Sequence, residues 1–307
     1  MSDLKKIIAR GLAASFLGIA VQSALPDIVN ANTPSQLCDN SALTSYIPSQ
    51  RSNAQSADQF IASILNLNGD QRDNAVVEEV LSGNIPDFLR NLQPVELRTN
   101  DDTSVVICVM PDYIGVGDDA DYVRTPVDRD AAFTIAEAFG FALPTPRMVD
   151  AIYSQAAIRV SPRTQTPDSR MTTTSYFDIH NDTIEAQIAG RGRNHLVAGM
   201  KKDIVLSNRL LNEPNNIAIY GWHTSERNPI QPLNLWHGEY YADYSHGVRL
   251  VSRTVFVDGQ PMDIYAALAD PQLSTALSDE GPMPAIRGFV SANIQRGLTP
   301  AQPTLRP

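Results

Sequence analysis

Residues that could do chemistry are concentrated between residues 180 and 246. This stretch holds all five histidines, both tryptophans, four of the ten tyrosines and one of the two lysine pairs. An imidazole titrates near neutral pH, a nearby carboxylate can fix its tautomer, and a phenol can donate a proton to a leaving oxygen. The stretch therefore predicts general acid–base catalysis, and the candidate catalytic residues are His246, Asp243, His237, Lys202 and His223.

The segment from Asp243 to Gly247 carries the strongest part of this prediction. Within five residues it places an acid, a phenol, a hydroxyl and an imidazole. The pair Lys201-Lys202 leads into a strand-like segment, and the chain otherwise uses arginine except at Lys5 and Lys6. A lysine at a sheet end could hold a carboxylate or an oxyanion, and the alternative is a solvated surface pair.

Aromatic side chains in the same stretch alternate with groups that form hydrogen bonds. Flat rings with polar tips suit polar, ring-shaped ligands, so a sugar is the expected ligand. An aromatic core beneath a long loop is the alternative. The candidate substrate-binding residues are Trp222, Trp236, Tyr241, Tyr244, Gln231, Arg249 and His180.

Other kinds of catalytic site lack their signatures. No H-E-x-x-H, H-x-H or C-x-x-C motif is present, so no cofactor is expected. A divalent metal held by His180, His237 and His246 with Asp243 remains an alternative, because zinc ligands can come from separate elements. Ser245 lies outside any G-x-S-x-G elbow, and the chain has no G-x-G-x-x-G or phosphate-binding loop.

Composition limits the class of protein and its partners. The chain has 307 residues, 43% of them hydrophobic, and a formal net charge of -10. An acidic protein repels phosphate backbones, so nucleic acid is not an expected partner. Cys38 and Cys108 are the only cysteines, and they predict either one disulfide or two buried thiols.

The amino-terminal segment has features of an export signal. Lys5, Lys6 and Arg10 precede an uncharged stretch of 11 residues at 11–21, and Val29-Asn30-Ala31 offers small residues for a signal peptidase. An amphipathic helix is the alternative. Residues 1–31 are therefore predicted to be a signal peptide, with a secreted or periplasmic mature chain that has no membrane span.

Several elements must position these residues. Helices are expected where the 3.6-residue period follows a capping residue, at 56–66, 70–81, 128–140 and from 145 onward. Strands are expected at apolar runs, at 95–97, 105–110, 204–206, 217–220, 248–257 and 262–264. Asp258-Gly259 is the strongest hairpin signal, and residues 160–175 are expected to form a long loop or lid.

These patterns together predict an α+β fold. The expected arrangement is a helical first half and a mostly antiparallel sheet in the second half, in a single compact body over residues 57–297. A polar arm at 32–56 precedes this body and a proline-rich tail at 298–307 follows it. The expected function is a secreted hydrolase that acts on glycan or peptidoglycan-type substrates, so polysaccharide or a cell-wall fragment is the expected partner. A non-catalytic carbohydrate-binding or surface protein and a metal-dependent hydrolase are the alternatives.

Overall fold

The computed structural model describes residues 33–189, 191 and 194–298. The predicted export signal and residues 299–307 of the predicted tail lie outside this part of the chain. The described residues belong to one compact unit, which includes the expected polar arm. None of the helices in the described ranges is long and apolar enough to cross a membrane.

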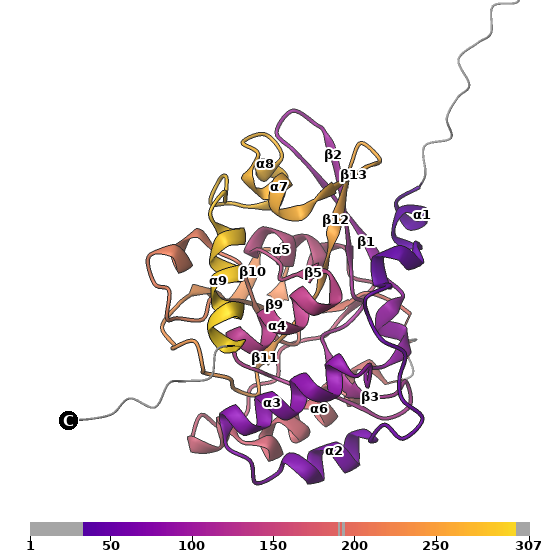
Figure 1. The fold of residues 1–307 in the computed structure, drawn as a ribbon, viewed down its shortest axis with the longest axis vertical. Helices are drawn as coiled ribbons and strands as arrows, with labels where there is room; N and C mark the ends of the chain where they lie inside the picture. The colour runs from indigo at the N-terminus through magenta and orange to yellow at the C-terminus, as the bar shows by residue number, and fades with distance from the viewer. Residues whose placement is uncertain (1–32, 190, 192–193, 299–307) are drawn as a thin grey trace, which may run out of the picture. The chain divides into compact units, whose positions relative to one another are not determined.

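The larger sheet lies in the core and is antiparallel throughout. Its strands run in the order β1 (Gln93–Arg98), β2 (Ser104–Val109), β12 (Val251–Val257) and β13 (Gln260–Asp263), and β5 (Phe141–Ala142) also pairs with β12. Residues 105–109 of β2 are all buried. Asp258 and Gly259 both have positive φ, as the tight turn between β12 and β13 requires. Figure 1 shows β2 and β12 side by side, although about 140 residues separate them in sequence.

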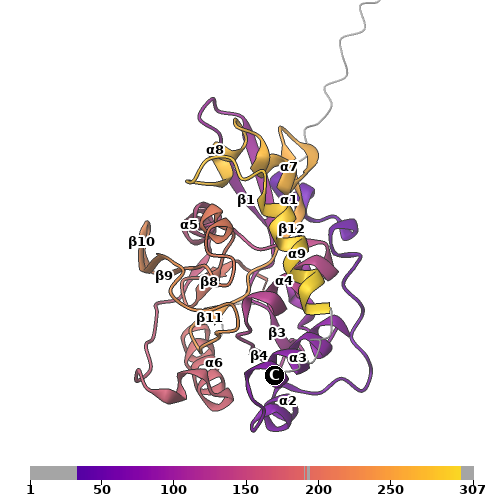
Figure 2. The same cartoon turned by 60° about the vertical axis from the view of Figure 1, so that its left-hand side comes forward.

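The second sheet positions the candidate site. Its order is β10 (Asn228–Asn234), β9 (Ile219–Ser225), β8 (Lys202–Ile204) and β11 (His246–Gly247). The strands β8 and β11 are parallel, and this pairing sets His246 opposite Lys202. Figure 2 shows β8 and β11 between helix α5 (Pro146–Gln155) above and helix α6 (Thr174–Ile188) below.

Two short strand pairs complete the sheet structure. The strand β3 (Gly115–Gly117) pairs with β4 (Tyr122–Arg124) in antiparallel fashion. The strand β6 (Ile158–Arg159) pairs with β7 (Val197–Ala198) in parallel. The second pair joins the segment that follows α5 to the segment that leads into β8.

Most helices begin where the sequence offers a cap. Ser56 and Asn68 form capping boxes at α2 (Ala57–Ile64) and α3 (Gly69–Leu81), and Asp128 and Thr145 cap α4 (Arg129–Phe139) and α5. The other α-helices are α1 (Pro34–Cys38), α6, α7 (Ile264–Ala269), α8 (Ser274–Leu277) and α9 (Ile286–Leu298). The 3₁₀ helices are η1 (Ser41–Thr44), η2 (Asp87–Arg90), η3 (Ser169–Thr172) and η4 (Asn208–Leu211).

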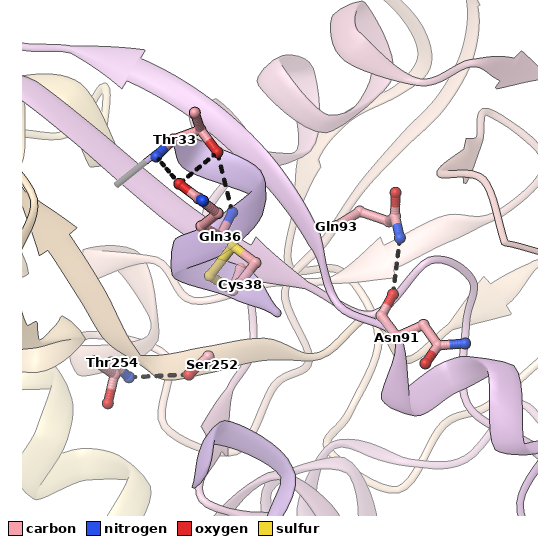
Figure 3. The surroundings of a disulfide bond; sticks show 8 residues. Thr33, Gln36, Cys38, Asn91, Gln93, Ser252 and Thr254 are labelled. Carbon is pink, nitrogen blue, oxygen red and sulfur yellow. Dashed lines mark hydrogen bonds between the residues drawn. A yellow bond between two sulfur atoms is a disulfide. The ribbon is translucent and has the colours of Figure 1, made fainter. Parts of the chain in front are cut away.

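A disulfide attaches the amino-terminal arm to the larger sheet. Cys38 at the end of α1 bonds to Cys108 in β2, with 5.3 Å between the two Cα atoms. Figure 3 shows this bond beside Thr33 and Gln36, which form the capping box of α1. Of the two alternatives for the cysteines, the structure has the disulfide.

The α+β fold with antiparallel sheets in one compact body is confirmed, but the division into a helical half and a strand half is loose. Helices α6 to α9 follow residue 160, and strands β1 to β6 precede it. Ile264 begins α7 instead of ending a strand, because the Asp263 carboxylate accepts hydrogen bonds from the first backbone amides of the helix. The proline-containing run at 228–234 forms β10, which tolerates proline because it is an edge strand.

Candidate functional site

Asp243 lies at the centre of a buried polar cluster beside β11. Its Oδ1 accepts hydrogen bonds from the backbone N of Ser245 at 2.8 Å and from the Ser245 hydroxyl at 2.5 Å. Its Oδ2 accepts from the Tyr241 hydroxyl at 3.2 Å and lies 3.9 Å from Nε2 of His246. Burial raises the pKa of Asp243, but His246, Lys202 and the Ser245 hydrogen bonds outweigh burial and lower this pKa to about 2. The carboxylate is therefore ionised at neutral pH.

His246 is a neutral imidazole inside the protein. Its side chain is fully buried, and burial lowers its pKa to about 4, with Lys202 and His237 acting in the same direction and Asp243 opposing them. Neither ring nitrogen has a hydrogen-bond partner among the described residues. A neutral imidazole beside a carboxylate can accept a proton and is then stabilised as the cation.

The two lysines of the pair occupy different environments. Lys201 is fully buried, and its Nζ donates to the backbone oxygen of Tyr244 at 2.6 Å. Burial and the nearby Arg124 guanidinium lower the pKa of Lys201 to about 7. Lys202 reaches solvent, and its Nζ lies 5.0 Å from the centre of the Trp222 ring. Burial also lowers the pKa of Lys202, and Asp243 opposes this shift.

Tyr244 connects the cluster to a second buried histidine. Its ring contacts the His180 ring at 5.0 Å and the Trp222 ring at 6.3 Å, both edge to face. Burial and Lys201 lower the pKa of His180 to about 2, so this ring is also neutral. The loop at 160–168 and the helix η3 cover this face, because Gln165 N donates to the Tyr244 hydroxyl and Tyr244 N donates to the Met171 oxygen.

Trp222 adopts a strained backbone conformation. Its φ is +61° and that of the preceding Gly221 is +118°. A bulky residue with positive φ is a genuine outlier that costs about 1–3 kcal/mol, and such strain clusters at binding and active sites. The two residues turn strand β9 where it pairs with Lys202, and the indole lies beneath the Lys202 ammonium.

Unpartnered polar atoms concentrate in this one place. The described residues contain eight buried side-chain nitrogen or oxygen atoms without a hydrogen-bond partner, and five of them belong to His180, His246 and Trp222. Each such group costs about 1–3 kcal/mol, whereas a whole domain is stable by about 5–15 kcal/mol. A cost of this size in a native protein calls for an explanation, and a buried water, a bound ligand or a catalytic role would each supply one.

His223 lies apart from this cluster although Trp222 is its neighbour in β9. Its Nε2 is 2.8 Å from Oδ1 of Asp150, which also accepts from the Tyr220 hydroxyl at 2.8 Å. The ring stacks on Tyr153 with 4.6 Å between centres. Asp150 lines a separate polar cleft of about 640 Å³, so His223 belongs to a different face of the sheet.

The remaining predicted residues occupy three kinds of position. His237 stacks on Tyr241 with 3.9 Å between ring centres, at the edge of the Asp243 cluster. Trp236 is 88% exposed, and it lines a shallow hollow of about 470 Å³ with Gln231. Arg249 is fully buried and donates to the backbone oxygens of Met110 and Val197, so its contacts tie loops together.

Two groups close to the cluster were not among the predicted site residues. Lys201 is buried beside Tyr244, and Asp203 accepts a hydrogen bond from the Tyr113 hydroxyl at 2.9 Å. Burial raises the pKa of Asp203 to about 6. Successive residues of a strand point to opposite faces, so the alternation in Lys201-Lys202-Asp203 was the available signal that Lys201 and Asp203 face away from Lys202.

The cluster draws together many of the predicted residues. It contains His246, Asp243, His237, Lys202, Tyr241, Tyr244, Trp222 and His180. Across the described ranges, no group of three or more histidine, cysteine, aspartate or glutamate side chains has a metal-binding arrangement. No protein-family model, curated protein or solved structure matches this chain.

Proposed function

We propose that this protein is a secreted hydrolase that cleaves glycan or peptidoglycan-type substrates by acid–base chemistry at His246 and Asp243. The observation that carries the proposal is the pair itself: a neutral imidazole with both nitrogens unpartnered, 3.9 Å from an ionised carboxylate. In the proposed step, His246 accepts a proton from the attacking water, and Asp243 stabilises the resulting imidazolium. The water oxygen bonds to the substrate carbon, the bond between that carbon and the leaving oxygen breaks, and His246 returns the proton to the leaving oxygen.

Lys202 and Tyr244 supply the other groups that such a reaction needs. The Lys202 ammonium reaches solvent beside Asp243 and can stabilise negative charge on a substrate oxygen. Tyr244 lies between His180 and Trp222, and burial raises the pKa of its phenol, so the phenol stays protonated. The backbone around these groups is held by β8 and β11, and rigid elements keep catalytic groups in register.

A hollow along the edge strand β10 supports a carbohydrate ligand. Gln231, Asn234 and Trp236 line one hollow along the edge strand β10, and the Trp236 ring is 88% exposed. Sugar rings bind on exposed aromatic faces, and amide groups can bond their hydroxyls. The Cys38–Cys108 disulfide supports the proposed export, since disulfides persist in oxidising compartments.

Turnover by one pair of variants tests the proposal. Purified wild type, His246→Gln and the matched control His195→Gln are assayed for reducing ends released from soluble polysaccharides and for muropeptides released from peptidoglycan. His195 is exposed and outside the cluster. His246→Gln should lower turnover by about 10² to 10⁴, with the control unchanged and both melting temperatures within a few degrees of wild type. Full activity of His246→Gln would refute the role of this residue, and loss of activity in chelator would favour a metal-dependent reaction.

A carbohydrate-binding protein without catalysis is the second candidate. The exposure of Trp236 and the complete burial of His246 favour it, because the binding surface is open and the imidazole is covered. In that case glycans bind without being cleaved, Trp236→Ala abolishes binding, and His246→Gln changes only stability. Binding measured with the same set of polysaccharides separates the two functions.

A further inference from the structure

We propose that the substrate of this site is an acidic glycan, and that Lys202 and the Trp222 indole bind its carboxylate. This inference rests on the proposed function, which supplies a glycan as the substrate, and it adds that the glycan is acidic. The shared chemistry is a carboxylate carried by a pyranose, directly in a uronic acid and through a lactyl ether in a muramyl residue that has no stem peptide.

Two hydrogen-bond donors lie together in this part of the cluster. The Trp222 side chain is 4% exposed, and its Nε1 has no partner among the described residues. The Lys202 ammonium lies 5.0 Å from the centre of the same ring and reaches solvent. An indole N–H and an ammonium can only donate, so a ligand group that binds both must be an acceptor. A carboxylate serves both donors and also neutralises the ammonium.

The strained backbone supports a binding role for Trp222. A φ of +61° is unfavourable for tryptophan, so the surrounding structure must hold this backbone conformation. In this conformation the indole lies beneath the Lys202 ammonium. The loop at 160–168 and η3 cover the indole, through Met171 and through the hydrogen bond from Gln165 N to the Tyr244 hydroxyl. A carboxylate that reaches Nε1 must displace this cover, so binding should expose the Gln165 amide to solvent.

Binding measurements with matched acidic and neutral glycans test the inference. The ligands are an oligogalacturonate and a muramyl-containing glycan fragment without stem peptides, each compared with its carboxyl-reduced form by titration calorimetry. The variants are Lys202→Met, Lys202→Arg and Trp222→Phe, and Arg98→Gln is the control because Arg98 is exposed on β1. Wild type should bind at least one acidic ligand about tenfold or more tightly than its reduced form, since a hydrogen bond to a charged group contributes at least this factor.

The variants should show how much each of the two donors contributes to the preference for the acidic ligand. Lys202→Met should remove the preference for the acidic ligand, Lys202→Arg should restore most of it, and Arg98→Gln should leave it unchanged. Trp222→Phe keeps an aromatic ring, although a smaller one, and loses the N–H, so it should remove part of the preference. Hydrogen exchange at the Gln165 amide should accelerate when the acidic ligand is bound and stay constant with the reduced form.

The outcomes separate this inference from the proposed hydrolase. Equal affinity for acidic and reduced ligands, no binding of either acidic ligand, or a full preference retained by Lys202→Met would each overturn the carboxylate site. Turnover of neutral glycans with no acidic preference would leave the hydrolase and refute the carboxylate site. Binding of an acidic ligand that depends on Lys202, without turnover, would support the carboxylate site and refute the hydrolase. The acidic ligand that the protein binds identifies the source of the carboxylate as a uronic acid or a muramyl residue.

Discussion

Replacing Lys201 by methionine should make the protein more stable at neutral pH, by an amount that depends on pH. The side chain is fully buried, and burial lowers its pKa from 10.5 to about 7. A lysine whose pKa is lower in the folded state than in the unfolded state costs stability below the unfolded pKa, because the unfolded chain binds the proton more readily. The cost is complete below pH 7 and disappears as the pH rises from 7 towards 10.5.

The magnitude follows from the size of the shift. Each pKa unit is worth about 1.4 kcal/mol, so a shift of about 3.5 units costs up to about 5 kcal/mol at low pH. Between pH 6 and pH 9, this contribution to the free energy of unfolding should recover by about 2 to 3 kcal/mol. Lys201→Met has no such group, so its advantage over wild type should shrink by that amount over the same range. Loss of the hydrogen bond to Tyr244 adds a constant offset.

Urea denaturation of wild type and Lys201→Met at pH 6, 7, 8 and 9 measures this difference directly. Other titrating groups are common to both proteins and cancel in the comparison. Lys202→Met is the matched control, because Lys202 reaches solvent and should show a weaker dependence on pH. A difference between wild type and Lys201→Met that is independent of pH would refute the reasoning, since Lys201 would then keep its ordinary pKa through its neighbours.

Two further predictions concern stability. Replacing both Cys38 and Cys108 by alanine should lower the free energy of unfolding by about 4 kcal/mol, because the disulfide closes a loop with a sequence separation of 70. A loss below about 1 kcal/mol, measured by urea denaturation, would contradict this prediction. Gly117→Ala should cost about 1–3 kcal/mol, because Gly117 has φ of +123° and a Cβ there would overlap the backbone oxygen of Asp121. Gly69→Ala is its control, because a Cβ at the start of α3 meets no atom within 4 Å. Equal melting temperatures for the two variants would refute the prediction that Gly117 needs its positive φ.

Local sequence signals predicted the longer helices and strands in the first half of the fold, and one hairpin turn in the second half. Ser56, Asp128 and Thr145 cap helices that begin at the next residue, and Asp258-Gly259 forms the expected hairpin turn. These signals work because the groups that interact lie within four residues of one another. Helix α6 lacked such a signal, since Thr173 makes no side-chain hydrogen bond as its cap and many residues of the helix are polar.

For the site, the sequence determined the inventory and the tertiary structure determined the grouping. The concentration of histidines, aromatics and lysines between residues 180 and 246 is visible in the sequence, and so is the run from Asp243 to His246. Tyr220 and His223 both contact Asp150, whereas residues three positions apart lie on opposite faces of a regular strand. The positive φ angles of Gly221 and Trp222, which lie between them, accompany this irregularity, and no residue pattern in the sequence specifies it.

Burial is the other property that only the folded chain decides. Lys201 and Lys202 are neighbours of the same type, yet one is fully buried with a pKa near 7 and the other reaches solvent. This difference arises from the parallel pairing of β8 with β11 and from the loop that covers Tyr244, which bring together residues from 165 to 246. The sequence by itself determined which groups are available for acid–base chemistry. Contacts between distant segments decided which of these side chains are buried away from water, and this desolvation shifts their pKa and so sets their charge.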